Sequence, residues 1–202
     1  MAKEEAPKKK KFDPSVLEGL GKGFARYDRI RSAVFKGLDI DPELVDEAIG
    51  FYEKVREIST AAEMAKRVGD TERAITDFVK AKSYLLAARV AKKAGDTERA
   101  NALYEKQIEE LRILGKRGDA AGVAEEYLGT ERAIRFCDEN GMYFRAAKLA
   151  EKQGDIDRAL GFYEKGHLFV TAVRLAEKHG KAEKAERYKK LAEEQEKQLR
   201  SK

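Results

Sequence analysis

A short phrase built around glycine recurs along this chain, and it constrains the possible folds more than any other feature. The clear copies read VGDTERA at 68–74, AGDTERA at 94–100, QGDIDRA at 153–159 and HGKAEKA at 179–185. Gly69 and Gly95 are 26 residues apart, and so are Gly154 and Gly180. A fixed period of this length is typical of an array of small structural units. Degenerate copies at 118–119 and 129–133 interrupt the spacing, so we expect an irregular stretch at 112–129.

The chemistry of the phrase is that of a tight turn between two helices. Glycine readily adopts the left-handed conformation that ends a helix, and the following Asp or Thr accepts hydrogen bonds from the first amides of the next helix. All three prolines lie in the first 42 residues, so the rest of the chain lacks this helix breaker. We expect the first helices of the hairpins near 51–68, 82–94, 119–128, 142–153 and 167–179. The second helices should run near 70–80, 96–117, 130–140, 155–165 and 181–200.

The residues that flank each turn glycine also repeat, with the spacing of one helical face. In the four clear copies, counted from the glycine, positions −8, −4 and +5 are always alanine. Position −11 holds a large residue, namely Ile58, Tyr84, Tyr143 or Phe169, and position +9 is aromatic in three copies, as Phe78, Tyr104 and Tyr163. Offsets of three, four and seven residues share a helical face. The pattern predicts a core in which alanines allow close helix approach and large residues fill the remaining space.

The N-terminal part of the chain precedes the array. Asp13-Pro14 and Asp41-Pro42 each combine a helix cap with a first-turn proline and predict two more helices, the second running unbroken from Pro42 into the first repeat. We therefore expect a basic disordered tail at 1–12, an N-terminal helical segment at 13–50, and a helical-repeat domain at 51–202 that ends in a polar capping helix. The predicted fold class is all-α: an α-solenoid of about five antiparallel hairpins with two or three N-terminal helices.

The hairpin pattern A-A-x-x-A-x-x-x-G-D-x-x-x-A-x-x-x-Y, over about residues 55–190, resembles tetratricopeptide-like α-solenoids. It is most similar to the shorter Gly-Asp hairpins of coat and intraflagellar-transport solenoids and of soluble NSF attachment proteins. The repeat is 26 residues long rather than about 34, and the Trp-Leu-Gly start and the terminal proline of the tetratricopeptide repeat are missing. The resemblance implies a non-catalytic adaptor or scaffold.

Composition argues against several classes of function. Two histidines and one cysteine do not supply a zinc site, a disulfide framework or a Cys/His catalytic pair, so we expect no enzyme, no metal and no cofactor. The single Cys137 is predicted to be a small buried hydrophobe. No apolar run approaches 18 residues and no secretory signal is evident, which predicts a cytoplasmic protein without a membrane span.

The charges on the first helices are sorted by sign. Positions −6 and −2 hold Glu63 and Arg67, Arg89 and Lys93, Lys148 and Lys152, and Arg174 and Lys178, and Arg145 at position −9 extends one row. If the first helices line the concave side, as in tetratricopeptide-like stacks, these cations form a basic stripe. An alternative is that the cations only interact with helix dipoles and pair with nearby glutamates. On the second helices the signs alternate, as in Glu72-Arg73, and we expect those charges only to solvate the helix.

These observations favour a protein-interaction scaffold that binds an acidic peptide or protein partner. The candidate partner-binding residues form the stripe just described: Arg67, Arg89, Lys93, Arg145, Lys148, Lys152, Arg174 and Lys178. The alternative function is an RNA- or ribonucleoprotein-associated factor that uses the same stripe together with the lysines at 8–11.

Overall fold

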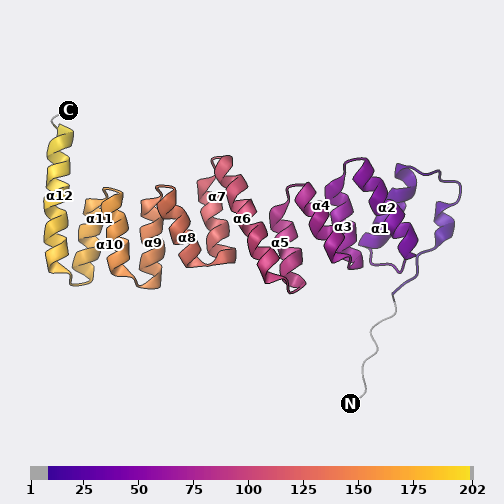
Figure 1. Ribbon diagram of the computed structural model, residues 1–202, viewed down its shortest axis with the longest axis horizontal. Helices are drawn as coiled ribbons and strands as arrows, with labels where there is room; N and C mark the ends of the chain where they lie inside the picture. Colours follow the sequence, from indigo (N-terminus) through magenta and orange to yellow (C-terminus); the bar gives the residue numbers. More distant parts are fainter. Residues whose placement is uncertain (1–8, 201–202) are drawn as a thin grey trace, which may run out of the picture. The chain divides into compact units, whose positions relative to one another are not determined.

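The computed structural model describes residues 9–200, which fold into helices joined by short turns (Figure 1). The chain divides into two compact units, Met1–Gln107 and Ile108–Lys202, with the boundary inside one helix. The first unit contains the 3₁₀ turn η1 (Pro14–Leu17), α1 (Phe24–Phe35), α2 (Pro42–Lys54), α3 (Ile58–Val68), α4 (Thr71–Lys80), α5 (Tyr84–Lys93) and the start of α6 (Thr97–Ile113). The second contains α7 (Arg117–Val123), the π-helical turn η2 (Ala124–Leu128), α8 (Thr130–Glu139), α9 (Tyr143–Gln153), α10 (Ile156–Lys165), α11 (Phe169–Lys178) and α12 (Ala182–Arg200).

Helices dominate the described part of the chain, and consecutive helices pack against each other within each unit. The only β pairing among residues 9–200 is an isolated bridge between Lys11 and Asp39. The predicted all-α helical-repeat fold class is therefore confirmed. No helix in this described part is both long and apolar enough to cross a membrane.

The turn chemistry predicted from the repeated phrase is present at the hairpin turns. Gly69 and Gly154 adopt φ angles of 88° and 81°, and each follows the last residue of a first helix. The next residue caps the second helix, because the side chains of Asp70 and Asp155 accept hydrogen bonds from backbone amides three residues on, at 3.2 and 3.1 Å. Such a cap satisfies an amide that has no partner within the helix.

The packing columns form the core as predicted. The alanines at positions −8 and −4 are buried in all four clear copies, and so are those at +5 and the aromatic residues at +9. Position −11 differs, since only Phe169 is buried there, while Ile58, Tyr84 and Tyr143 are half-buried. Cys137 is fully buried, and this burial raises the pKa of its thiol.

The predicted continuous helix from Pro42 into the first repeat is wrong. Helix α2 ends at Lys54, and Arg56 takes a left-handed conformation with φ of 62°. The amide of Glu57 then donates to the carbonyl of Tyr52, which closes the helix end. Apolar spacing carries on across this break because both helices bury a face, so periodicity alone does not reveal the turn. Lys82 and His167 adopt the same left-handed conformation before α5 and α11.

The N-terminal segment also departs from the expected pattern. Asp13 caps only the 3₁₀ turn η1, and α1 begins later, at Phe24. Residues 1–8 of the predicted basic tail, including Lys8, lie outside the described residues. In the described remainder, the amide of Phe12 donates to the carbonyl of Asp39 at 2.8 Å. Residue 50, at which the predicted N-terminal segment ends, lies inside helix α2 and within the first unit.

The charges on the second helices do more than solvate them, which corrects the expectation from the sequence. Each of several ion pairs joins a second helix to an equivalent helix 27 residues away. In the first unit Arg99 pairs with Glu72 at 2.8 Å. In the second, Arg158 pairs with Glu131 at 2.7 Å and Lys184 with Asp157 at 2.6 Å. The acidic–basic dipeptide of the repeated phrase, which is Glu-Arg, Asp-Arg or Glu-Lys, therefore links successive hairpins.

Candidate functional site

A basic groove lies in the first unit, between the carboxyl-terminal end of α3 and helix α5. It has a volume of about 670 Å³ and is lined by four cations, namely Lys66, Arg67, Arg89 and Lys93. The other lining residues are Gly69, Thr71, Phe78, Leu86, Val90 and Ala94. No carboxylate among residues 9–200 lines the groove, and its apolar wall includes Leu86, whose exposed fraction is 40 %. Three of the predicted partner-binding residues are thus brought together.

The repeat itself positions these cations. Lys66 and Arg67 lie in the last turn of α3, and Lys93 ends α5, where a positive charge interacts favourably with the helix dipole. The Arg67 guanidinium lies 4.5 Å from the centre of the Phe35 ring and donates to the Phe35 carbonyl at 3.3 Å. Lys66 pairs with Glu63 in the preceding turn. Helix dipoles and nearby glutamates therefore account for part of the basic columns at positions −6 and −2. The four cations nevertheless line the same open groove.

Lys66 is a groove residue that the sequence analysis missed, although the sequence contains a signal for it. Position −3 is Lys66 and Lys92 in the first unit but Glu151 and Glu177 in the second. Its change of sign makes the first-helix ends of the first unit more strongly basic than those of the second.

In the second unit the predicted residues have different environments. Arg145 is half-buried and donates to the carbonyl of Gly118 at 2.6 Å, so its guanidinium is directed toward α7. Lys148 pairs with Glu151 at 3.2 Å, and Lys152 pairs with Glu125 of η2 at 2.9 Å. These contacts take Arg145 out of the basic surface and partly neutralise the row on α9.

The two predicted cations on α11 are accessible to solvent. Arg174 and Lys178 are exposed, and neither has a carboxylate partner among residues 9–200. They lie one helical turn apart on the same face of α11. This helix therefore presents the most available pair of predicted cations in the second unit.

A further column of side chains lies at position −10. In three of the four clear copies it holds Leu85, Phe144 and Val170, each one turn before the basic residue at −6, whereas the first copy has Ser59 and Glu63 at these positions. Phe144 and Val170 are 54 % and 58 % exposed, whereas Leu85 is half-buried. Helices α5, α9 and α11 thus share a row of one apolar and two basic residues at positions −10, −6 and −2, which we call the apolar–basic row. In the sequence, this row is marked by an apolar residue at position −10, which lies outside the core columns.

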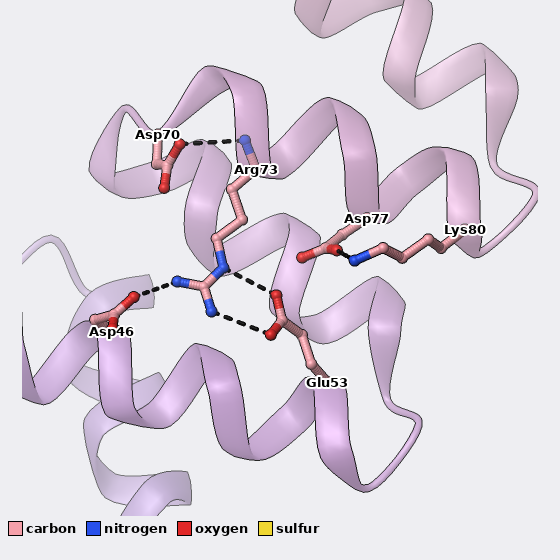
Figure 2. A network of polar contacts seen from close by, with 6 residues as sticks. All are labelled: Asp46, Glu53, Asp70, Arg73, Asp77 and Lys80. Carbon is pink, nitrogen blue, oxygen red and sulfur yellow. Dashed lines mark hydrogen bonds and ion pairs between the residues drawn. The ribbon is translucent and has the colours of Figure 1, made fainter.

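A second polar cluster in the first unit is structural (Figure 2). Arg73 of α4 donates to both carboxylate oxygens of Glu53 on α2, at 2.9 and 3.1 Å, and also contacts Asp46. These bonds hold the pKa of Glu53 below its ordinary value. Asp77 is fully buried beside them and accepts from Lys80 at 2.8 Å, and burial raises the pKa of its carboxyl. The contacts of Arg73 with Glu53 and Asp46 fasten α4 to α2. The Asp77 carboxyl is closed to solvent, so a substrate does not reach it.

No family model matches the chain, and no curated protein matches it. A search of solved structures finds similarity to a "circular tandem repeat protein with novel repeat topology and enhanced subunit contact surfaces", with 21 % sequence identity and a TM-score of 0.20. The match covers 87 % of this chain and 44 % of that chain, so this chain spans less than half of that repeat protein. In the described part of this chain, no group of three or more His, Cys, Asp and Glu side chains is placed to hold a metal ion.

Proposed function

We propose that this protein is a non-catalytic interaction module that binds an acidic segment of a protein partner along the first helices of its repeats. The observation that carries the proposal is the groove of about 670 Å³ lined by Lys66, Arg67, Arg89 and Lys93, with no carboxylate from the described part of the chain in its lining. Cations that converge on an open, partly apolar groove favour a ligand with complementary negative charge. The resemblance of the hairpin phrase to tetratricopeptide-like arrays, whose members are adaptors, supports the same role.

An acidic protein segment fits the groove better than RNA does. Proteins that bind single-stranded nucleic acid stack the bases on exposed aromatic rings. Among the described residues, the aromatic side chain that lines the groove is Phe78, which is buried, and the exposed apolar side chain is the aliphatic Leu86. An aliphatic wall suits a peptide side chain, while the cations meet carboxylates.

The test measures the affinity of the full chain for a fluorescent peptide of about 15 residues made of Glu and Ser, by fluorescence anisotropy. Reversing two groove charges, with Arg89→Glu and Lys93→Glu, should weaken binding about tenfold or more. The matched control reverses two exposed lysines on α12, with Lys190→Glu and Lys197→Glu. This control changes the net charge equally and should leave the affinity within about twofold.

Several results would overturn the proposal. Equal losses in the groove variant and in the α12 control would mean that the peptide responds only to net charge. An RNA of about 15 nucleotides that binds more tightly than the peptide, with a steep dependence on salt, would favour the RNA-associated alternative. Circular dichroism of both variants checks that the helices are retained.

A further inference from the structure

Helices α9 and α11 each expose a large apolar side chain at the same position of the repeat. Phe144 is 54 % exposed and Val170 is 58 % exposed, and the two residues are 26 positions apart. Single exposed apolar residues are common on protein surfaces and need no explanation. Recurrence at an equivalent position in successive hairpins, on a helix with a fully buried opposite face, indicates a shared surface.

The apolar residues and the cations of the apolar–basic row lie on one face. Positions −10, −6 and −2 are separated by four residues, which places Phe144 with Lys148 on α9 and Val170 with Arg174 and Lys178 on α11. The Phe144 ring lies 6.1 Å from the Tyr163 ring, and the Lys148 ammonium lies 5.9 Å from the centre of the Phe144 ring. Positive charge therefore stands directly beside exposed apolar surface on each helix.

We infer that this face of the second unit binds an amphipathic acidic segment of a protein partner, whose apolar side chains cover Phe144 and Val170 while its carboxylates meet Lys148, Arg174 and Lys178. The inference rests on the proposed function and makes its partner more specific. Charge complementarity selects the occupant, because Arg174 and Lys178 have no carboxylate partner among the described residues. A purely polar acidic segment would leave both apolar side chains in water.

RNA is a poorer occupant of this face. Phe144 offers a ring on which a base can stack, but the equivalent residue on α11 is Val170, which cannot stack. A peptide that presents apolar residues at helical spacing can use both positions. The face therefore discriminates between an amphipathic segment and a simple polyanion.

The test compares two fluorescent peptides of about 16 residues with the same number of Glu residues. One carries Leu at helical spacing and the other carries Ser at those positions. The full chain should bind the Leu peptide about 10- to 30-fold more tightly, because two half-exposed side chains are covered only in that complex. The double variant Phe144→Ser, Val170→Ser should remove most of this preference and leave the affinity for the Ser peptide unchanged. A preference that persists in full would assign it to another apolar surface, such as Leu86 in the groove of the first unit, and would overturn the inference.

A matched control removes an exposed apolar residue that is not part of any apolar–basic row. Leu199 on α12 is 70 % exposed, and Leu199→Ser should keep the preference for the Leu peptide. A measurement on the unmodified protein guards against misfolded variants. Between about 50 and 300 mM salt both affinities should fall, while the ratio between the two peptides stays constant, because the apolar contribution is not screened.

The outcomes separate this inference from the proposed function. If both peptides bind equally and both depend on Arg89 and Lys93, the inference fails and the proposed function stands. If neither peptide binds, both fail. If an RNA of about 16 nucleotides binds and its affinity falls in the Phe144→Ser, Val170→Ser variant as that of the Leu peptide does, the face recognises nucleic acid and the inference is overturned.

Discussion

Replacing Arg73 with Met should destabilise the first unit far more than the same change at Arg99. Both arginines occupy the same place in the repeated phrase GDTERA, so a difference between them can come only from their surroundings. Met keeps most of the aliphatic stem and removes the guanidinium. Arg73 donates to both oxygens of Glu53 and also contacts Asp46, whereas the Arg99 guanidinium pairs with a single carboxylate of the described residues, that of Glu72.

The expected magnitudes follow from burial. The side chains of Arg73 and Glu53 are 24 % and 26 % exposed, and breaking a buried pair costs about 3–5 kcal/mol when one charge is left without its partner. Because this pair retains some access to water, we expect Arg73→Met to lower the free energy of unfolding by about 2 kcal/mol. The side chain of Glu72 is 76 % exposed, so Arg99→Met should cost about 0.5 kcal/mol or less.

The loss at Arg73 should also depend on pH. Hydrogen bonds from Arg73 hold the pKa of Glu53 below its ordinary value. A carboxyl group of this kind contributes stability above its unfolded pKa, and that contribution disappears as the pH falls through its folded pKa. The difference between wild type and Arg73→Met should therefore be full at pH 7 and shrink below about pH 4.5.

Urea unfolding followed by circular dichroism, at about pH 7 and about pH 3.5, measures both effects. Helical content should be equal in the folded state of all three proteins. Equal losses for Arg73→Met and Arg99→Met would refute the reasoning, because they would show that the network on Glu53 adds nothing. A loss at Arg73 that does not shrink on acidification would refute the assignment to the Glu53 carboxylate.

Three further predictions concern buried and strained positions. Burial raises the pKa of Asp77, so its contribution to stability is lost as the pH rises through that pKa; Asp77→Asn should therefore gain stability relative to wild type as the pH rises above about 4, and a constant difference in urea unfolding would contradict this. Cys137 is fully buried with a raised thiol pKa, so a thiol reagent should label it only after unfolding, and rapid labelling of the folded protein would count against its core position. Gly154 has φ of 81°, and Gly154→Ala should cost about 1 kcal/mol in thermal unfolding, whereas Gly161→Ala, within α10 and with open space around it, should be neutral or stabilising.

Part of the candidate site follows from the sequence. The basic columns led to Arg67, Arg89 and Lys93, which line the groove, because helical periodicity determines which residues share a face. Lys66 and Val170 did not emerge, since a residue beside a core column can point either into the core or into water. Arg145 was assigned to the stripe, yet its guanidinium bonds to the Gly118 carbonyl, a partner set by helix packing.

The sequence by itself determined the turns and the buried faces. A glycine with a capping Asp is a local signal, and alanines at fixed offsets define one helical face without reference to any other helix. Only the tertiary structure decided where α2 ends, because apolar spacing continues across the left-handed turn at Arg56. It also decided the roles of identical phrases: Arg73 and Arg99 share the sequence GDTERA, but their ionic partners lie 20 to 27 residues earlier in the chain. Periodicity fixes what each helix buries, whereas the stacking of hairpins fixes what each charge meets.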